Sequence, residues 1–588
     1  MTNNNDRHPG GLPPSLPEAF AARTSRLMGD AIWQRFVRAM AEPTTTSVRL
    51  NPLKAAIGSG GMGTGTGADG MAAVTACGIN ATESDTNATL PTGSDTPTSA
   101  GGNFAADKET RAMGAGAVAA AFADGGDAGT RSGKKAAEGY GTASVDGGFT
   151  GIEGNKNGKA AVAAAFADGG DKGRKTVEIA AVAGIDMREA EAVAWCRGAY
   201  YLPSRPLFTA DPLLHAGVYY VQEASSMFLD TVLRQYCGGS DIALLDLCAA
   251  PGGKSTLARA ALTAGSLVVS NEPVRQRAAV LSENMQKWGH PGVIVTCNYA
   301  ADFSRAGMMF DVVMADVPCS GEGMFRKDPT AARLWSPRAA EQCRHLQRSI
   351  VRDVWQSLKP GGLLIYSTCT FNSGENEDNA MFIARELGAD ILPVDIDGAW
   401  NITGSLSSDC PEHVYRFIPG TARGEGLFMA VMRKHGGCAR ETISRRRPPS
   451  SIASIPPWLT CEDREMTITR TGDTLTAMPS RWQPTLDTAR QRLHVVHAGV
   501  TVAIVKGGDI VPAHSLAMSA DINAAAFCTA DIDYAQAMAY LRRQPLSLPP
   551  STPRGYVLLR FGGHPLGFVK NIGSRANNMY PQAWRIMK

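Results

Sequence analysis

Two cysteines lie in short segments where an apolar run gives way to small and polar residues. Cys319 belongs to DVPCSGEGMF, which begins at Asp316, and Cys369 belongs to STCTF, which begins at Ser367. A thiolate is a strong nucleophile, and a neighbouring carboxyl group can exchange a proton with the group under attack. A single free cysteine is more often a packed core residue. The combination of two thiols with a carboxylate, however, favours nucleophilic catalysis.

A third segment, LLDLCAAPGGKST at residues 244–256, ends like a phosphate-binding P-loop. A P-loop needs a glycine where Cys248 stands, and a cysteine does not readily adopt the positive φ of that glycine. The other interpretation is a buried strand over 242–247, a turn of small residues, and a helix that begins near Gly253. This arrangement is typical of the entry to a Rossmann-like nucleotide site.

Elements that would position these residues alternate regularly from Asp241 onward. Helical stretches separate five apolar runs, at 243–248, 266–272, 292–298, 310–318 and 361–370. The alternation predicts a parallel sheet with helices on both faces, whose ligands bind beyond the carboxyl ends of the strands. Glu272 lies about twenty residues past the glycine turn, where a carboxylate can accept hydrogen bonds from a ribose. The pattern therefore predicts an adenosine compound as cofactor.

Composition limits the classes of protein that the chain can belong to. Its 588 residues imply about two to four domains, and its net charge of +3 identifies no partner. Residues 441–588 hold 17 Lys and Arg against 10 Asp and Glu, which fits an anionic partner but is also a common solubility pattern. The 12 cysteines are scattered without CxxC pairs or histidine clusters, which argues against zinc and against a disulfide framework.

No apolar run reaches the length needed to span a membrane, and the N-terminal MTNNNDRHPG lacks the apolar core of a signal peptide. We therefore expect a cytoplasmic protein without a membrane partner. Residues 55–176 are rich in small residues and contain AVAAAFADGGD twice, at 117–127 and at 161–171. Two copies are too few for a solenoid, so this composition predicts a low-complexity, disordered insertion.

Four segments occur in the order found in one enzyme family: CAAPGGKST, DVPCSGEGMFRKDP, LWSP and YSTCTFNSGENE. With these, the chain resembles the Sun-type RNA cytosine-C5 methyltransferases, over about residues 16–54 and 195–588. The closing segment LLRFGGHPLGFVKNIGSRANNMYP resembles the PUA-like end of the bacterial small-subunit rRNA branch. The resemblance implies an α/β fold, namely a Rossmann-like S-adenosylmethionine-dependent methyltransferase domain with an N-terminal RNA-binding subdomain and a C-terminal PUA-like α+β domain.

The resemblance also implies roles for the thiols. Cys369 would add to C6 of a cytosine, because a thiolate bonded there turns the ring into an enamine whose C5 carries electron density. Asp316 would lie beside the cofactor and the N3 edge of the base. Cys319 would help to release the product, as a base or through a water molecule.

Cofactor contacts follow from the same resemblance, which implies S-adenosylmethionine and no metal. The turn on the methionine side would comprise Cys248, Ala249, Ala250, Pro251, Gly252, Gly253 and Lys254. Glu272 would hold the ribose. On the adenine side, Asn298 and Asp302 both remain candidates, because TCNYAADF does not match the family pattern cleanly.

RNA is the expected partner, and two groups of basic residues are candidates for contact with its phosphates. They are Arg326 and Lys327 after the Cys319 loop, and Arg560, Lys570 and Arg575 in the closing segment. We expect the chain to divide into an N-terminal subdomain in two parts (1–54 and 177–240) around the insertion (55–176), a catalytic domain (241–436), a linker (437–490) and the PUA-like domain (491–588).

Two other functions remain open. The same motifs occur in relatives that modify tRNA, so tRNA is an alternative substrate. A different class is a non-catalytic ribosome-assembly factor that keeps the fold for RNA binding. A binding module does not require paired thiols, which argues against this second alternative.

Overall fold

A computed structural model describes residues 16–55, 184–410, 413–436, 457–460 and 465–587. Both copies of the repeat and almost all of the predicted insertion lie outside these ranges. Within them, no helix combines the length and the apolar character that a bilayer crossing requires.

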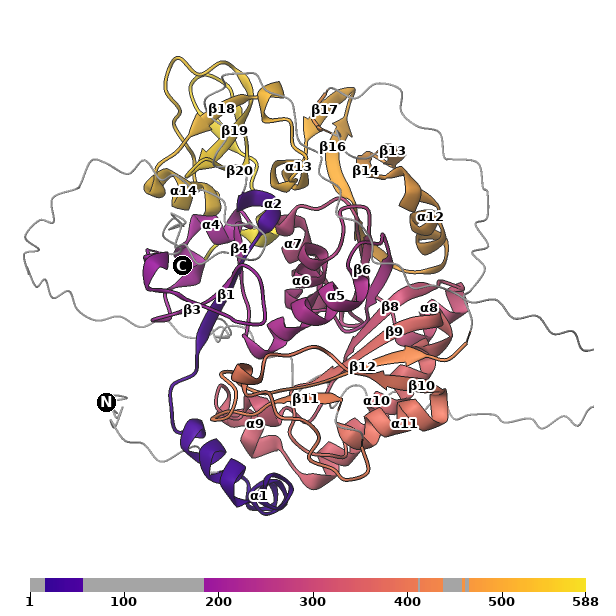
Figure 1. Cartoon of the computed structure of the whole chain (residues 1–588). Coiled ribbons are helices and arrows are strands. Elements are labelled where there is room, and N and C mark those ends of the chain that lie inside the picture. The colour runs from indigo at the N-terminus through magenta and orange to yellow at the C-terminus, as the bar shows by residue number, and fades with distance from the viewer. Residues whose placement is uncertain (1–15, 56–183, 411–412, 437–456, 461–464, 588) are drawn as a thin grey trace, which may run out of the picture. The chain divides into compact units, whose positions relative to one another are not determined.

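Strands within residues 243–434, together with β15 from the expected PUA-like domain, form one mixed sheet in the order β10-β12-β9-β8-β5-β6-β7-β15, with β11 paired to β12. Figure 1 shows β8, β9 and β12 side by side in this sheet. Its five parallel strands are β5 (Ala243–Asp246), β6 (Leu267–Asn271), β7 (Val293–Thr296), β8 (Phe310–Asp316) and β9 (Leu358–Thr368). The antiparallel strands are β10 (Ala389–Leu392), β11 (Val414–Phe417), β12 (Leu427–Lys434) and β15 (Val495–Ala498). The strand order reverses beside β5, and such a switch point opens a ligand crevice at the carboxyl edge.

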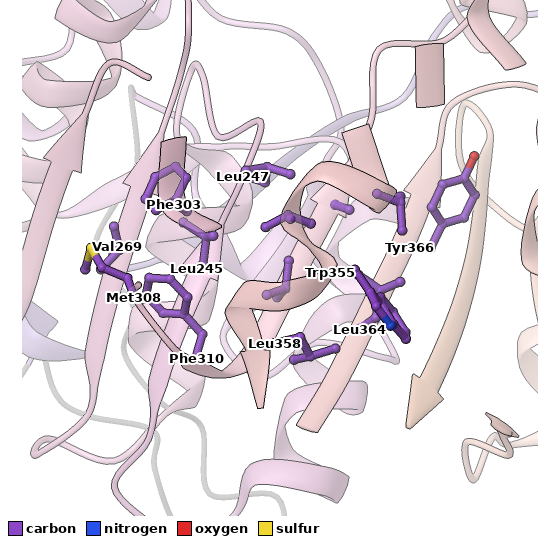
Figure 2. Packing of buried hydrophobic residues seen from close by; sticks show 14 of the residues in the cluster. Leu245, Leu247, Val269, Phe303, Met308, Phe310, Trp355, Leu358, Leu364 and Tyr366 are labelled. Carbon is purple, nitrogen blue, oxygen red and sulfur yellow. The ribbon is translucent and has the colours of Figure 1, made fainter. Parts of the chain in front are cut away.

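Helices surround this sheet because its parallel strands are apolar on both faces. Leu245 of β5 belongs to one buried cluster, while its neighbour Leu244 belongs to the cluster on the other side. Figure 2 shows Leu245, Phe303 and Phe310 packed together on the first side. The surrounding helices are α5 (Leu229–Cys237), α6 (Gly253–Ala261), α7 (Arg275–Trp288), α8 (Ala300–Ala306), α10 (Pro337–Val354) and α11 (Glu377–Leu387).

Segments on both sides of the predicted insertion join in a second, antiparallel sheet of order β2-β3-β1-β4. Its strands are β1 (Thr46–Leu50), β2 (Glu191–Ala192), β3 (Ala199–Leu202) and β4 (Tyr219–Val221). Arg49 of β1 is buried and donates from Nη2 to Thr256 Oγ1 on α6, at 2.8 Å. This bond ties the N-terminal sheet to the helix that follows the glycine turn.

Helix α1 (Glu18–Met40) packs apolar side chains against the two segments that carry Cys319 and Cys369, which are called the thiol segments below. Its Phe20 lies edge-on to Phe325, with ring centroids 5.1 Å apart, and its Phe36 lies edge-on to Phe371 at the same distance. Phe325 and Phe371 follow Cys319 and Cys369 in the chain. The N-terminal helix therefore supports both thiol segments from one side.

Two four-stranded sheets complete the chain. The first contains β13 (Met466–Thr471), β14 (Thr474–Pro479), β16 (Val500–Lys506) and β17 (Asp509–Pro512), and the second contains β18 (Cys528–Asp531), β19 (Gly555–Phe561), β20 (His564–Asn571) and β21 (Ala576–Asn578). The structure differs here from the expected linker over 437–490, because the β13–β14 hairpin pairs with β16 across the predicted boundary. The apolar alternation in this hairpin is too short to identify it from sequence.

A buried ion pair fixes the start of α11 to β11. Arg416 donates from Nε to Glu377 Oε1 at 2.8 Å and from Nη1 to Phe371 O at 2.8 Å, and its Nη2 pairs with Glu377 Oε2. Both side chains are 1% exposed. We predict that Arg416→Met lowers the free energy of unfolding by about 3–5 kcal/mol, because it leaves the Glu377 carboxylate buried without a cation.

Urea unfolding checks this prediction. Arg188→Met is the matched control, since Arg188 pairs with Asp186 at the surface and its loss should leave the unfolding free energy nearly unchanged. The double substitution Arg416→Met/Glu377→Leu should recover part of the loss. Equal stability of Arg416→Met and the unmodified protein would show that the pair does not hold α11.

Candidate active site at the carboxyl edge of the sheet

The two thiols meet at the carboxyl ends of neighbouring strands. Asp316 at the end of β8 pairs in register with Ser367 of β9, so Cys319 and Cys369 leave the sheet side by side. Their Sγ atoms are 3.2 Å apart. The structure thus brings together the two thiols that the sequence placed on separate segments.

The two thiols differ in environment. Cys319 is 4% exposed, whereas Cys369 is only partly buried. The hydrogen bond with Cys369 and desolvation by burial raise the pKa of Cys319 well above its usual range. Cys319 is therefore a neutral thiol at physiological pH, and Cys369 is the more accessible of the two thiols.

A carboxylate and an ammonium lie beside the thiols. Asp316 accepts a hydrogen bond from Ser367 Oγ at 2.7 Å on Oδ1, and one from Lys254 Nζ at 2.8 Å on Oδ2. Burial alone lowers the pKa of Lys254, but the attraction of Asp316 outweighs it, and the net pKa is raised. Lys254 is therefore a cation that connects the glycine turn to the thiol site.

The glycine turn, residues 248–254, is held by α7. Gly252 has φ +117, and a Cβ there would lie 3.3 Å from Leu281 Cδ1, so a larger residue would be both strained and crowded. Arg277 donates to Ala250 O at 3.0 Å, and Asn284 donates to Pro251 O at 2.8 Å. Burial raises the pKa of Cys248 well above its usual range, so this thiol is neutral.

Asp246, at the end of β5, is a functional candidate that sequence reasoning missed. It is fully buried, and Oδ2 accepts a hydrogen bond from Ser255 Oγ at 2.6 Å. Oδ1 has no hydrogen-bond partner among the described residues. Burial raises the pKa of this carboxyl to about 7. A buried acceptor left unused beside the turn fits a ligand that brings its own N–H donor.

Glu272 lies at the next strand tip, after β6, and is 1% exposed. Oε1 accepts a hydrogen bond from Val274 N at 3.0 Å, and Oε2 is 3.3 Å from Arg277 Nη1. A carboxylate has about four acceptor positions, so these contacts leave capacity for the hydroxyls of a ribose. The unused acceptor oxygens of Asp246 and Glu272 therefore fit the N–H donors of an amino group and the hydroxyls of a sugar respectively.

Both candidates for the adenine side already have local partners. The Asn298 side chain exchanges two hydrogen bonds with the backbone of His494, at 3.2 and 3.0 Å. Asp302 accepts from Tyr299 N at 2.8 Å at the start of α8 and also pairs with Arg305. Neither geometry singles out an adenine contact.

Three further buried polar residues at this edge were not identified from the sequence, namely Glu322, Asn372 and Glu375. They stand within the cysteine motifs, as the second acidic residue of DVPCSGEGMF and within TFNSGENE. Their only sequence signal was polarity close to a thiol, which is also typical of a solvated loop.

The basic residues divide into two kinds. The predicted phosphate contact of Arg326 is wrong. Its side chain is 8% exposed and pairs with Glu425, with Nη2 2.7 Å from Oε1, so it holds two loops together and is not free for a phosphate. Lys327 is exposed, as are Lys570 and Arg575. Arg560 forms two hydrogen bonds with Asp531, at 3.0 and 2.6 Å. Within the described ranges no group of three or more His, Cys, Asp or Glu side chains is suited to a metal ion.

Residues 239–433 match the model of the 16S rRNA methyltransferase RsmB/F family, and residues 528–586 match the methyltransferase RsmF PUA domain. Three relatives are named ribosomal RNA small subunit methyltransferase F. That of Aeromonas salmonicida is 30% identical over 414 residues, covering 67% of this chain and 84% of the relative. That of Shewanella amazonensis is 28% identical over 416 residues (67% and 85%), and that of Escherichia coli K12 is 28% identical over 417 (66% and 84%).

These matches confirm the predicted fold class, with its Rossmann-like catalytic domain and a PUA domain near the end of the chain. They also agree with the family named from the sequence motifs. The chain belongs to the RsmB/F family of 16S rRNA methyltransferases and is an S-adenosylmethionine-dependent enzyme.

Proposed function

We propose that the protein methylates C5 of a cytidine in small-subunit rRNA through a covalent bond between Cys369 and C6 of the base. The observation that carries this proposal is the 3.2 Å separation of the Cys319 and Cys369 thiols, beside the Asp316–Lys254 pair. Transfer of a methyl group to an oxygen or to an exocyclic nitrogen needs no thiol. Two thiols at one site therefore favour attack on a ring carbon.

Addition begins when Cys369 gives its proton to the Asp316 carboxylate, directly or through water, and its sulfur bonds to C6. Electron density moves into the ring, and N3 then gains a hydrogen bond or a proton from Asp316. Lys254 Nζ, 2.8 Å from Asp316 Oδ2, holds that carboxyl group in place for both proton transfers. Bound S-adenosylmethionine supplies the methyl group that C5 accepts.

Release needs a base for the C5 proton, and Cys319 is suited to that step only after addition. The free Cys369 thiol is the main cause of the high pKa of Cys319. Once Cys369 is bonded to C6 it can no longer bear a negative charge, so that part of the rise in the pKa of Cys319 is removed while burial still raises it. Cys319 then takes the C5 proton after giving its own proton to water, or relays it through a water molecule. Loss of the C5 proton then reforms the C5–C6 double bond, the Cys369 thiolate leaves, and N3 returns its proton to Asp316.

Binding of the cofactor rests on three groups of the chain. Glu272 would accept hydrogen bonds from the ribose, the 248–254 turn would surround the methionine side, and Asp246 Oδ1, which has no partner among the described residues, would receive the amino group. Asn298 and Asp302 stay open for the adenine side.

The RNA must present an unstacked cytidine, because C6 is not accessible within a helix. Lys327 beside the thiol segments, and Lys570 and Arg575 in the PUA domain, are exposed and suited to phosphates. Arg560 is paired with Asp531, so only the guanidinium edge that faces away from Asp531 is left for a phosphate. The family description names 16S rRNA, and we therefore place tRNA second.

Replacing Cys369 and replacing Cys319 should have different effects on the reaction. Cys369→Ser should abolish methylation and form no covalent RNA complex, because a hydroxyl is mostly un-ionised at neutral pH. Cys319→Ala should still add to C6 but release slowly, so the protein should remain on the RNA in a denaturing gel.

Each variant is incubated with labelled 16S rRNA and run on a denaturing gel. Cys343→Ala, which replaces another buried thiol, is the control. A packed core cysteine would lose only about 1–2 kcal/mol of stability on truncation and would trap no RNA. An adduct with Cys369→Ser, or normal turnover by folded Cys319→Ala, would overturn the assigned roles.

Cofactor binding should depend on Glu272. Saturating S-adenosylmethionine should raise the melting temperature of the unmodified protein, whereas ATP with Mg²⁺ should not. Glu272→Ala should reduce that rise, because the ribose loses its acceptor. Differential scanning fluorimetry measures both, with the exposed Glu386→Ala as control. A rise with ATP and none with S-adenosylmethionine would refute the assignment of this site.

A further inference from the structure

Two buried carboxylates lie directly behind the thiols and take no part in the chemistry described above. Glu322 follows Cys319 in the chain, and Glu375 follows Cys369. Both are 0% exposed, and no basic side chain of the described residues forms a salt bridge with either. Burying an ionisable carboxyl group without a cation lowers the stability of the fold, so the presence of two such groups behind the thiols needs an explanation.

Glu322 binds the segment of the other thiol. Its Oε2 accepts hydrogen bonds from Phe371 N at 2.7 Å and from Asn372 N at 3.0 Å, just beyond Cys369. Its Oε1 accepts from Trp335 Nε1 at 3.1 Å. The next residue, Gly323, donates its N–H to Cys369 O at 2.7 Å. The Cys319 segment thus fixes the backbone on which Cys369 stands.

Glu375 binds in the opposite direction. Its Oε2 accepts hydrogen bonds from Ser320 N at 2.9 Å and from Gln347 Nε2 at 2.7 Å. The same Gln347 amide donates to Pro318 O at 2.9 Å. Pro318 and Ser320 flank Cys319, so the Cys369 segment fixes the backbone of Cys319.

One amide connects the two carboxylates. Asn372 Nδ2 donates to Glu322 Oε1 at 2.9 Å and to Glu375 Oε1 at 2.7 Å. Burial and the charge of Glu322 raise the pKa of Glu375 to about 7. The network therefore keeps two acidic groups close together at a cost in stability. The hydrogen bonds from Phe371 N to Glu322 and from Ser320 N to Glu375 cross from one thiol segment to the other, whereas the Asn372–Glu375 bond lies within the Cys369 segment.

We propose that Glu322 and Glu375 are positioning residues that set the separation of the Cys319 and Cys369 thiols, each by holding the backbone of the opposite segment. This inference rests on the proposed function only in taking the two thiols as the reacting pair. Because each carboxylate belongs to one segment and binds the other, neither segment can shift alone without breaking hydrogen bonds. The thiols therefore keep one separation while Cys369 gains and loses its bond to the base.

Disulfide formation by diamide measures the thiol separation without RNA or cofactor. Diamide takes two electrons and two protons from the two thiols as the S–S bond forms, and peptide mapping identifies the Cys319–Cys369 product. Thiols already 3.2 Å apart should react quickly in the unmodified protein. Failure of the cytosine chemistry would leave this rate unchanged, so the two proposals can fail separately.

Near-isosteric variants test the carboxylates. Glu322→Gln replaces one accepting oxygen by an NH₂ group that faces donors, so it should slow Cys319–Cys369 disulfide formation at least about tenfold, because reactions between held groups are sensitive to displacements near 1 Å. It should lower kcat for methylation and leave the KM for S-adenosylmethionine unchanged. Glu375→Gln can keep an oxygen for Ser320 N, as Glu322→Gln can for Phe371 N, but its NH₂ group then faces one donor, Asn372 Nδ2, and not two, so it should slow the disulfide less. Glu386→Gln, on the exposed face of α11, should change neither.

Folding of each variant is checked by its melting temperature. A wild-type rate of disulfide formation in folded Glu322→Gln would overturn the proposal. Should Glu322→Gln not fold, Glu375→Leu decides, because leucine cannot accept from Ser320 N: slower disulfide formation than in Glu375→Gln supports the proposal, and an equal rate refutes it. A loss of kcat with an unchanged disulfide rate would also count against it.

Discussion

The parallel pairing of β8 with β9 is the constraint on which the active site depends. Backbone hydrogen bonds fix the register of Asp316 opposite Ser367, and this register alone brings the two following segments to the same point of the sheet edge. Side chains cannot create that adjacency, because Cys319 and Cys369 are 50 residues apart in the chain. The buried carboxylates, the α1 aromatic residues and the Asp316–Lys254 pair then refine a geometry that the sheet already provides.

Electrostatics at this edge follow from burial. Burial drives Asp246 and Cys248 toward their neutral forms, and the hydrogen bond with Cys369, together with burial, does the same for Cys319. Lys254 is the exception, because Asp316 lies close enough to keep it charged. The site therefore combines neutral thiols with one fixed ion pair, which in the proposed reaction would lie beside the base.

The parallel strands and the meeting of the thiols could be predicted because apolar runs and cysteine motifs are local signals. The buried network around Asn372 could not, because Glu322 and Glu375 look in the sequence like solvated loop acids and become buried only when β8 and β9 pair. Arg326 was misjudged for the same reason: its partner Glu425 lies 99 residues away. The β13–β14 hairpin was missed because its pairing with β16 is set by tertiary contacts.

The most direct test of the account uses RNA in which the target cytidine carries fluorine at C5. Fluorine cannot leave as a proton does, so the reaction should stop after methyl transfer with the enzyme still bonded to C6. Mass spectrometry of the digested complex should find the methylated nucleotide on the peptide that contains Cys369. A nucleotide on the Cys319 peptide, or methylated RNA without any covalent complex, would contradict the account.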